Sequence, residues 1–200
     1  KAKAKDFRDR YMNERKLRRK LTDELAELKG NIRVVARCRP ASGNGVVEFP
    51  SGAEGALEVV NDHGLTQRFE FDRVFRPGSS QSDIFDHVAP VIQGCFDGIH
   101  ACIFAYGQTG SGKTFTITGG SERYEDRGII PRALSMIFQA FRDRSDCSWS
   151  AHVSYMEIYN EQGFDLLNES SGAKNLQDLP RVRMMEDEHG NFHLRNLSML

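Results

Sequence analysis

Residues 107–114 have the order G-x-x-x-x-G-K-T, with a further glycine at position 110. Glycines let main-chain N–H groups approach phosphate oxygens closely, because a larger side chain would block the approach. The ammonium group of Lys113 suits the outer phosphates, and the hydroxyl of Thr114 suits a magnesium ion. The spacing therefore predicts that residues 107–114 hold the phosphates of a nucleoside triphosphate. A flexible loop followed by a surface lysine is the competing interpretation.

The segments on either side of this loop are expected to position it. The apolar run 101–106 has the length of a strand that is buried on both faces. A helix is expected to begin at Lys113 or Thr114, and its positive N-terminal end would face the phosphates. Other helices are expected from Ser82 or Asp83 to residue 96 and from Pro131 onward. Other strands are expected at residues 31–40, 46–49, 56–60, 67–71 and 149–159, with a hairpin of 181–185 and 191–197. This β-α-β order around a parallel central strand predicts an α/β fold.

The first 29 residues are predicted to form one helix that ends at Gly30. Residues 1–20 hold ten lysines and arginines against three acidic residues, a net charge of +7, so the remaining residues carry −8. A basic arm of this kind suits an acidic partner, or it is a solvated helical face. Coiled-coil spacing indicates a possible homodimer through residues 7–28. The positions with this spacing are Phe7, Tyr11, Glu14, Arg18, Leu21, Leu25 and Leu28.

The four cysteines form no C-x-x-C pair and show no metal-ligand spacing with the six histidines. Apolar neighbours predict free, buried thiols in a reducing compartment. No apolar run reaches the length of a membrane span, so no membrane partner is expected.

Four motifs together resemble a kinesin motor domain: RCRP at residues 37–40, IFAYGQTGSGKTFT at 103–116, GIIPRAL at 128–134 and SYMEIYNE at 154–161. The resemblance implies the phosphate-loop NTPase fold of kinesin motors, in which helices flank a central mixed sheet. It divides the chain into a neck helix, residues 1–29, and the N-terminal part of a motor domain, residues 30–200.

The resemblance also implies ATP and Mg²⁺ as cofactors and assigns residues to them. Lys113 and Thr114 are the expected catalytic residues, and Thr114 is the expected magnesium ligand. Residues near the adenine would be Arg37, Arg39, Pro40 and Phe115. Phosphate-binding residues would be Gly107, Gln108, Thr109, Gly110, Ser111, Gly112, Lys113 and Thr114.

Microtubules are the partner that the resemblance implies, with no nucleic acid and with a location in the cytoplasm on the cytoskeleton. The segment 27–34, ELKGNIRV, resembles the junction between neck and motor in C-terminal-motor kinesins, which implies minus-end-directed movement. A hairpin around residues 189–195 resembles a minor tubulin contact of the family.

Two motifs that position water and magnesium in kinesins, N-x-x-S-S-R-S-H and D-L-A-G-S-E, do not occur in the 200 residues. We therefore expect the front half of a motor, inactive or weak as an ATPase by itself, within a protein that hydrolyses ATP. The alternative is a coiled-coil interaction module that binds nucleotide without hydrolysing it. An unrelated phosphate-loop kinase or GTPase is disfavoured, because the guanine motif N-K-x-D is missing.

Overall fold

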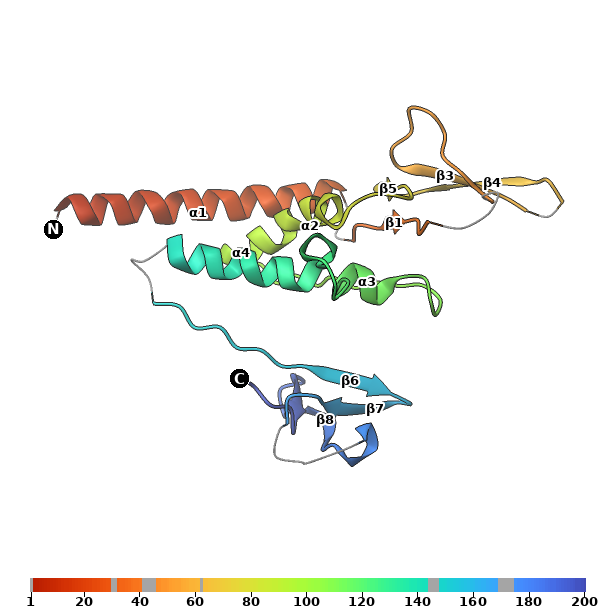
Figure 1. The fold of residues 1–200 in the computed structure, drawn as a ribbon. Helices are drawn as coiled ribbons and strands as arrows, with labels where there is room; N and C mark the ends of the chain where they lie inside the picture. Colours follow the sequence, from red (N-terminus) through yellow and green to blue (C-terminus); the bar gives the residue numbers. More distant parts are fainter. Residues whose placement is uncertain (1, 30–31, 41–45, 62, 144–147, 169–174) are drawn as a thin grey trace. The chain divides into compact units, whose positions relative to one another are not determined.

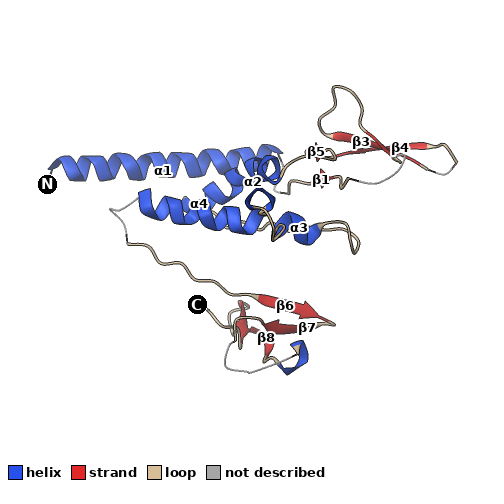
Figure 2. Cartoon of the chain, in the orientation of Figure 1, coloured by secondary structure: helices blue, strands red, loops and turns tan. Residues whose placement is uncertain are grey.

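The computed structural model describes residues 2–29, 32–40, 46–61, 63–143, 148–168 and 175–200 (Figure 1). The chain forms two compact units, Lys1–Asp143 and Arg144–Leu200, which we call the first and second unit. The first unit combines helices with strands, because α1 is followed by the strands β1–β5 and these by α2, α3 and α4, whereas the second unit consists mainly of strands (Figure 2). This mixture agrees with the predicted α/β class.

The helices of the first unit agree closely with the sequence pattern. They are α1 (Ala2–Lys29), α2 (Gln81–Phe96), α3 (Lys113–Ile117) and α4 (Ile129–Asp143), with a short 3-10 turn η1 (Tyr124–Asp126) before α4. The prediction of a helix over residues 1–29 is confirmed, and its expected stop at Gly30 lies outside the described residues. Pro131 lies in the first turn of α4, where its missing N–H has no helical partner to lose.

Helix α2 begins earlier than predicted. Its N-cap is Ser80, whose hydroxyl accepts a hydrogen bond from the main-chain nitrogen of Asp83 at 3.1 Å. Asp83 in turn accepts a bond from the Ser80 nitrogen at 2.8 Å. This reciprocal pair satisfies two free helix donors, so the expected caps at Ser82 or Asp83 were wrong by two or three residues.

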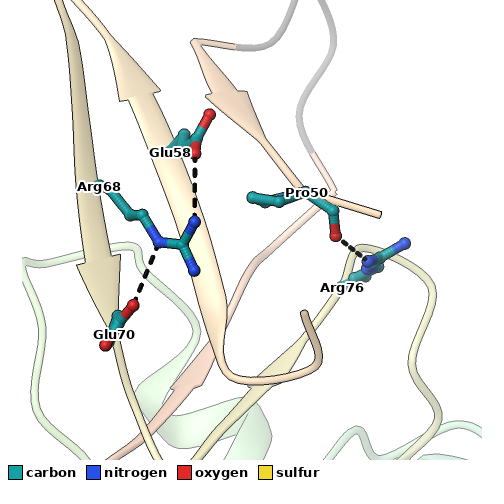
Figure 3. A network of polar contacts seen from close by, with 5 residues as sticks. All are labelled: Pro50, Glu58, Arg68, Glu70 and Arg76. Atoms are coloured by element: carbon teal, nitrogen blue, oxygen red, sulfur yellow. Dashed lines mark hydrogen bonds and ion pairs between the residues drawn. The ribbon is translucent and has the colours of Figure 1, made fainter. Parts of the chain in front are cut away.

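The strands of the first unit form two small sheets in the described residues. Strand β1 (Val35–Arg37) pairs in parallel with β5 (Arg73–Phe75). Strands β2 (Val47–Glu48), β3 (Ala56–Val60) and β4 (Thr66–Glu70) form an antiparallel meander. Glu58 and Arg68 lie opposite each other in that sheet, and Arg68 also contacts Glu70 (Figure 3). Strand β5 was not predicted, because three residues are too few to show a periodic pattern.

A small apolar core joins β5 to the helices. Phe75, Ile84 and Ile129 are buried together, and Val88 and Ile117 pack against them. These side chains come from β5, α2, α4 and α3. The core therefore places the short helix α3 beside the start of α2 and the end of the β1–β5 pair.

The predicted strand over residues 101–106 is wrong: this run is extended loop in the structure. Phe104 is 77% exposed and Tyr106 is 95% exposed. An apolar run favours burial, but a strand also needs a neighbouring strand to bond its main chain. Sequence composition alone does not reveal that neighbour.

The second unit is an antiparallel sheet of β6 (Met156–Tyr159), β7 (Gln162–Asp165), β8 (Arg181–Glu186) and β9 (Phe192–Arg195), in that order, with a 3-10 turn η3 (Leu176–Asp178). The predicted hairpin is confirmed as β8 and β9. The predicted strand 149–159 is confirmed only for its last four residues. Val153 and Tyr155, which precede β6 in this segment, are exposed.

Three cysteines are described, and the expectation that they are buried is wrong for two of them. Cys95 and Cys102 are exposed, whereas Cys38 is partly buried, and burial raises the pKa of its thiol. Cys147 lies outside the described residues. Among those residues, no helix combines the length and the apolar character that crossing a bilayer requires.

Candidate nucleotide-binding site

Glycine suits the backbone of the loop from Gly107 to Gly112. Gly110 has φ of 80° and Gly112, which precedes α3, has φ of 99°, a left-handed conformation that strains other residues. A Cβ added at Gly107 would lie 2.6 Å from the Ser111 hydroxyl oxygen, so the Ser111 side chain would have to move. The loop is therefore compact, and its glycines place no side chain over the main-chain groups that a ligand would contact.

The Lys113 ammonium group lies across this loop. It donates hydrogen bonds to the carbonyl oxygens of Gly107 at 2.8 Å and Gln108 at 3.0 Å. Thr116 donates its hydroxyl proton to the Gly112 carbonyl at 3.0 Å, which ties α3 to the end of the loop. Gln108, Thr109 and Thr114 are exposed on the surface of this segment. A cation is thus held at the loop, next to an accessible hydroxyl.

Arg37, at the end of β1, links the parallel strand pair to α3. Its Nη1 donates to Thr116 Oγ1 at 2.8 Å and to Gln81 Oε1 at 2.9 Å. Its guanidinium carbon lies 5.3 Å from the centre of the Phe115 ring, within range of a cation–π interaction. Burial lowers the pKa of Arg37 from its usual value. The structure therefore brings a planar cation and a flat aromatic ring together beside the loop.

Arg39 reaches the loop from the same segment, and its Nη1 donates to the Gly110 carbonyl. Arg39 and Pro40 are exposed. The predicted site residues on β1 and its extension thus meet the predicted loop, although about 70 residues separate them in sequence. Their approach depends on the β1–β5 pairing and on the core around Phe75.

Gln81 is the residue at this site that the sequence analysis missed. It is the first residue of α2 and only 4% exposed. A signal was available: Gln81, Ile84 and Val88 have the i, i+3, i+7 spacing of one helix face, so a polar residue at 81 falls on the apolar side. The amide bonds that it makes there could not be inferred, because they involve three distant segments.

The site has few groups that could hold a metal. Among the described residues, no cluster of three or more His, Cys, Asp or Glu side chains could hold an ion. The exposed Thr114 hydroxyl is one oxygen that the loop offers, beside those of Thr109 and Ser111. Such a donor set fits Mg²⁺ bound mainly by phosphate oxygens and water, with one protein ligand.

A glycine-rich loop that leads into a helix, approached by cationic residues from a neighbouring strand, is the arrangement of a phosphate-loop domain. Comparison with known families makes the class specific. The family model of the kinesin motor domain matches residues 27–200. The chain belongs to the kinesin motor domain family.

Curated relatives agree with this membership. The kinesin-like protein KIN-14R of Arabidopsis thaliana is 35% identical over 204 residues, which cover 98% of this chain and 18% of that protein. The kinesin-like protein KIN-14P of the same plant is 46% identical over 169 residues, covering 78% and 16%. Kinesin-related protein 2 of Dictyostelium discoideum is 39% identical over 181 residues, covering 82% and 23%. The chain thus spans about a fifth of the length of these relatives.

Proposed function

We propose that this chain binds ATP with Mg²⁺ at the loop 107–114 and that it is the nucleotide-binding part of a microtubule motor. The observation that carries the proposal is the meeting of Arg37 and Arg39 with Phe115 and Gly110. A guanidinium plane and an aromatic ring suit a flat base, whereas the loop suits phosphates. The base and the phosphates of one nucleotide would therefore bind next to each other.

Lys113 and Thr114 have separate tasks in this proposal. The Lys113 ammonium would exchange its bonds to the Gly107 and Gln108 carbonyls for phosphate oxygens, which are stronger acceptors. The Thr114 hydroxyl would complete the coordination of Mg²⁺, which is bound chiefly by the phosphates. Bound Mg²⁺ supplies charge neutralisation at the terminal phosphates.

The Lys113→Ala variant tests the pocket. Calorimetric titration of the variant with Mg-ATP should show an affinity lower by about 100-fold or more, as expected for the loss of a charged partner at a desolvated site. Lys20→Ala is the matched control, because Lys20 is an exposed lysine on α1. Unchanged ATP affinity in Lys113→Ala would show that the nucleotide binds elsewhere.

We further propose that residues 1–29 are a neck helix and residues 30–200 part of a motor domain whose protein acts on the cytoplasmic cytoskeleton. Membership of the kinesin family supports movement on microtubules. Similarity of residues 27–34 to a neck–motor junction supports minus-end direction. A gliding assay of the full-length protein on polarity-marked microtubules tests both, and plus-end movement would contradict the direction.

Hydrolysis distinguishes the motor from the alternative, a module that binds nucleotide without cleaving it. The full-length protein and the 200-residue chain should be compared for phosphate release with and without microtubules. A motor predicts strong stimulation in the full-length protein and weak or no release from the chain by itself. ATP binding without stimulated release in the full-length protein would favour the binding module.

Dimerisation through α1 is a separate proposal. Phe7, Tyr11 and Leu21 are exposed along the predicted seam. Arg18, on the same seam, instead pairs within the chain with Asp97 at 2.8 Å, so any dimer must accommodate this contact. Sedimentation of Leu21→Asp against the off-seam control Leu17→Asp tests the seam. Equal sedimentation of the two variants would contradict it.

A further inference from the structure

The side-chain amide of Gln81 makes three hydrogen bonds in an almost fully buried position. Its Nε2 donates to the carbonyl oxygens of Phe115 at 2.6 Å and Asp126 at 3.0 Å. Its Oε1 accepts from Arg37 Nη1 at 2.9 Å. The amide therefore connects the start of α2 with β1, α3 and the turn η1.

The chemistry of the partners determines which way the amide faces. Carbonyl oxygens only accept hydrogen bonds, and a guanidinium group only donates them. Of the common side chains of this length, glutamine alone offers two donors and an acceptor at one end. A glutamate would keep the acceptor for Arg37 but would place a carboxylate against two carbonyl oxygens. A methionine would fill the space and make none of these bonds.

Helix α3 and the loop have further bonds that do not involve Gln81. The Thr116 and Thr118 nitrogens donate to the Gly112 and Thr114 carbonyls at 2.9 and 2.8 Å. Lys113 is held by the loop carbonyls. In contrast, Arg37 depends on Gln81 for one of its two side-chain hydrogen-bond partners. Loss of the amide should therefore release the guanidinium more than it disturbs the phosphate loop.

We infer that Gln81 is a positioning residue for base recognition: it holds the Arg37 guanidinium against Phe115 so that the base half of a nucleotide is bound in one pose. The inference rests on the proposed nucleotide site and adds to it the residue that sets the preference for a base. Gln81 itself is buried beneath the site and need not touch the nucleotide.

The test compares two ligands that share the phosphate chain, of which only one carries the nucleoside, that is the base with its ribose. Affinities for Mg-ATP and Mg-tripolyphosphate are measured by calorimetry for the wild-type chain and for Gln81→Met. The ratio of the two affinities should fall by about tenfold in Gln81→Met, the effect of one lost hydrogen bond to a charged group. Tripolyphosphate affinity itself should change by less than about twofold, within the context dependence of a single contact. The Gln139→Met variant, at an exposed glutamine of α4, should leave both affinities unchanged.

Two further variants keep the test decisive if Gln81→Met folds poorly. Gln81→Glu retains the acceptor for Arg37 and should keep most of the preference for ATP, whatever its stability. Arg37→Met should lose the preference, and adding Gln81→Met to it should lower the preference no further. Equal losses for both ligands, or a Gln81→Glu variant as unselective as Gln81→Met, would overturn the inference.

Failure of the underlying nucleotide site has a different signature. If the wild-type chain binds neither ligand, or if Lys113→Ala still binds both, the proposed site is wrong and the inference is overturned with it. The wild-type chain could instead bind both ligands through Lys113, with the ratio of the two affinities unchanged in Gln81→Met. In that case the nucleotide site is supported and only the role of Gln81 is overturned.

Discussion

Each compact unit contains a deeply buried polar side chain that joins separate segments: Gln81 in the first unit and Asp165 in the second. Gln81 makes two donor bonds and one acceptor bond, to an arginine and to two carbonyl groups. Asp165, which is fully buried, only accepts, from the main-chain nitrogens of Leu167 at 3.0 Å and Ser198 at 2.7 Å. The neutral amide thus joins the Arg37 side chain to two main-chain carbonyl groups, whereas the carboxylate accepts bonds from two main-chain nitrogens and from the Ser198 side chain.

Their chemistry also separates their response to acid. Desolvation alone would raise the pKa of Asp165, but the hydrogen bonds from Ser198 and Leu167 outweigh it and lower the pKa below the usual value. An amide does not titrate in this range. Acid should therefore weaken the hydrogen bonds to Asp165 in the second unit and leave the hydrogen bonds of Gln81 in the first unit intact.

The largest expected effect is that of Asp165→Ala. The change leaves two partly buried N–H donors without their acceptor, which should lower the free energy of unfolding of the second unit by about 3 kcal/mol. Urea unfolding followed by the fluorescence of Trp149, the single tryptophan and a residue of the second unit, measures it. The control Asp178→Ala removes an exposed carboxylate and should cost less than about 0.5 kcal/mol. Equal losses would mean that burial of Asp165 is not what matters.

Gln81→Met should destabilise the first unit by about 2 kcal/mol, because two carbonyl groups and a guanidinium lose a buried partner. The loss should be the same at about pH 7 and about pH 4, since neither amide nor thioether titrates there. Hydrogen exchange of the α2 and α3 amides, read by mass spectrometry, measures it within this unit. A loss of stability that depends on pH would show that a titrating group is coupled to the hydrogen bonds of Gln81. It would contradict the proposed difference from Asp165.

Acid titration is expected to have a smaller effect. It tests the same difference between Gln81 and Asp165 through the group that titrates, Asp165. The folded pKa of Asp165 lies below the unfolded value, so its contribution is complete above about pH 4 and is lost as the pH falls through the folded pKa. Stability of the second unit should therefore decline below about pH 4, as read by Trp149 in a series of urea titrations.

Asp165→Asn provides the control for that titration, because it should make the decline shallower. The exposed Asp187 of the second unit, whose pKa is lowered by hydrogen bonds from Asn191, remains in this variant and accounts for part of the remaining slope. An unchanged slope in Asp165→Asn would show that Asp165 does not carry the acid response.

Local patterns predicted much of this fold. Helices α1 and α4, the β8–β9 hairpin and the position of the phosphate loop depend on residues close in sequence, such as Pro131 in the first turn of α4 and the turn at Asp187–Gly190. The predicted start of helix α2 was two or three residues too late, because Ser80, Ser82 and Asp83 are all good caps.

Features that depend on distant partners could not be predicted. Residues 101–106 are as apolar as a buried strand, yet the structure leaves Phe104 and Tyr106 exposed. The role of Gln81 likewise requires Arg37, Phe115 and Asp126 to meet, and no spacing in the sequence indicates that meeting. The family resemblance assigned Arg37 and Arg39 to the site. Their local sequence alone favours a surface strand whose cationic side chains face solvent.

The smallest effect is expected from Arg68→Ala, which removes polar contacts of a different kind. Arg68 lies 3.2 Å from Glu70 and 4.0 Å from Glu58, but its side chain is half exposed (Figure 3). Water replaces most of what such a pair contributes, so the loss should be below about 0.5 kcal/mol and should shrink further at high salt. Hydrogen exchange of the β3 and β4 amides measures it, with Arg142→Ala on α4 as an exposed control. A loss as large as that of Gln81→Met would mean that the number of polar contacts, rather than their burial, determines the stability of this unit. The explanation of the Gln81 and Asp165 effects by burial would then be wrong.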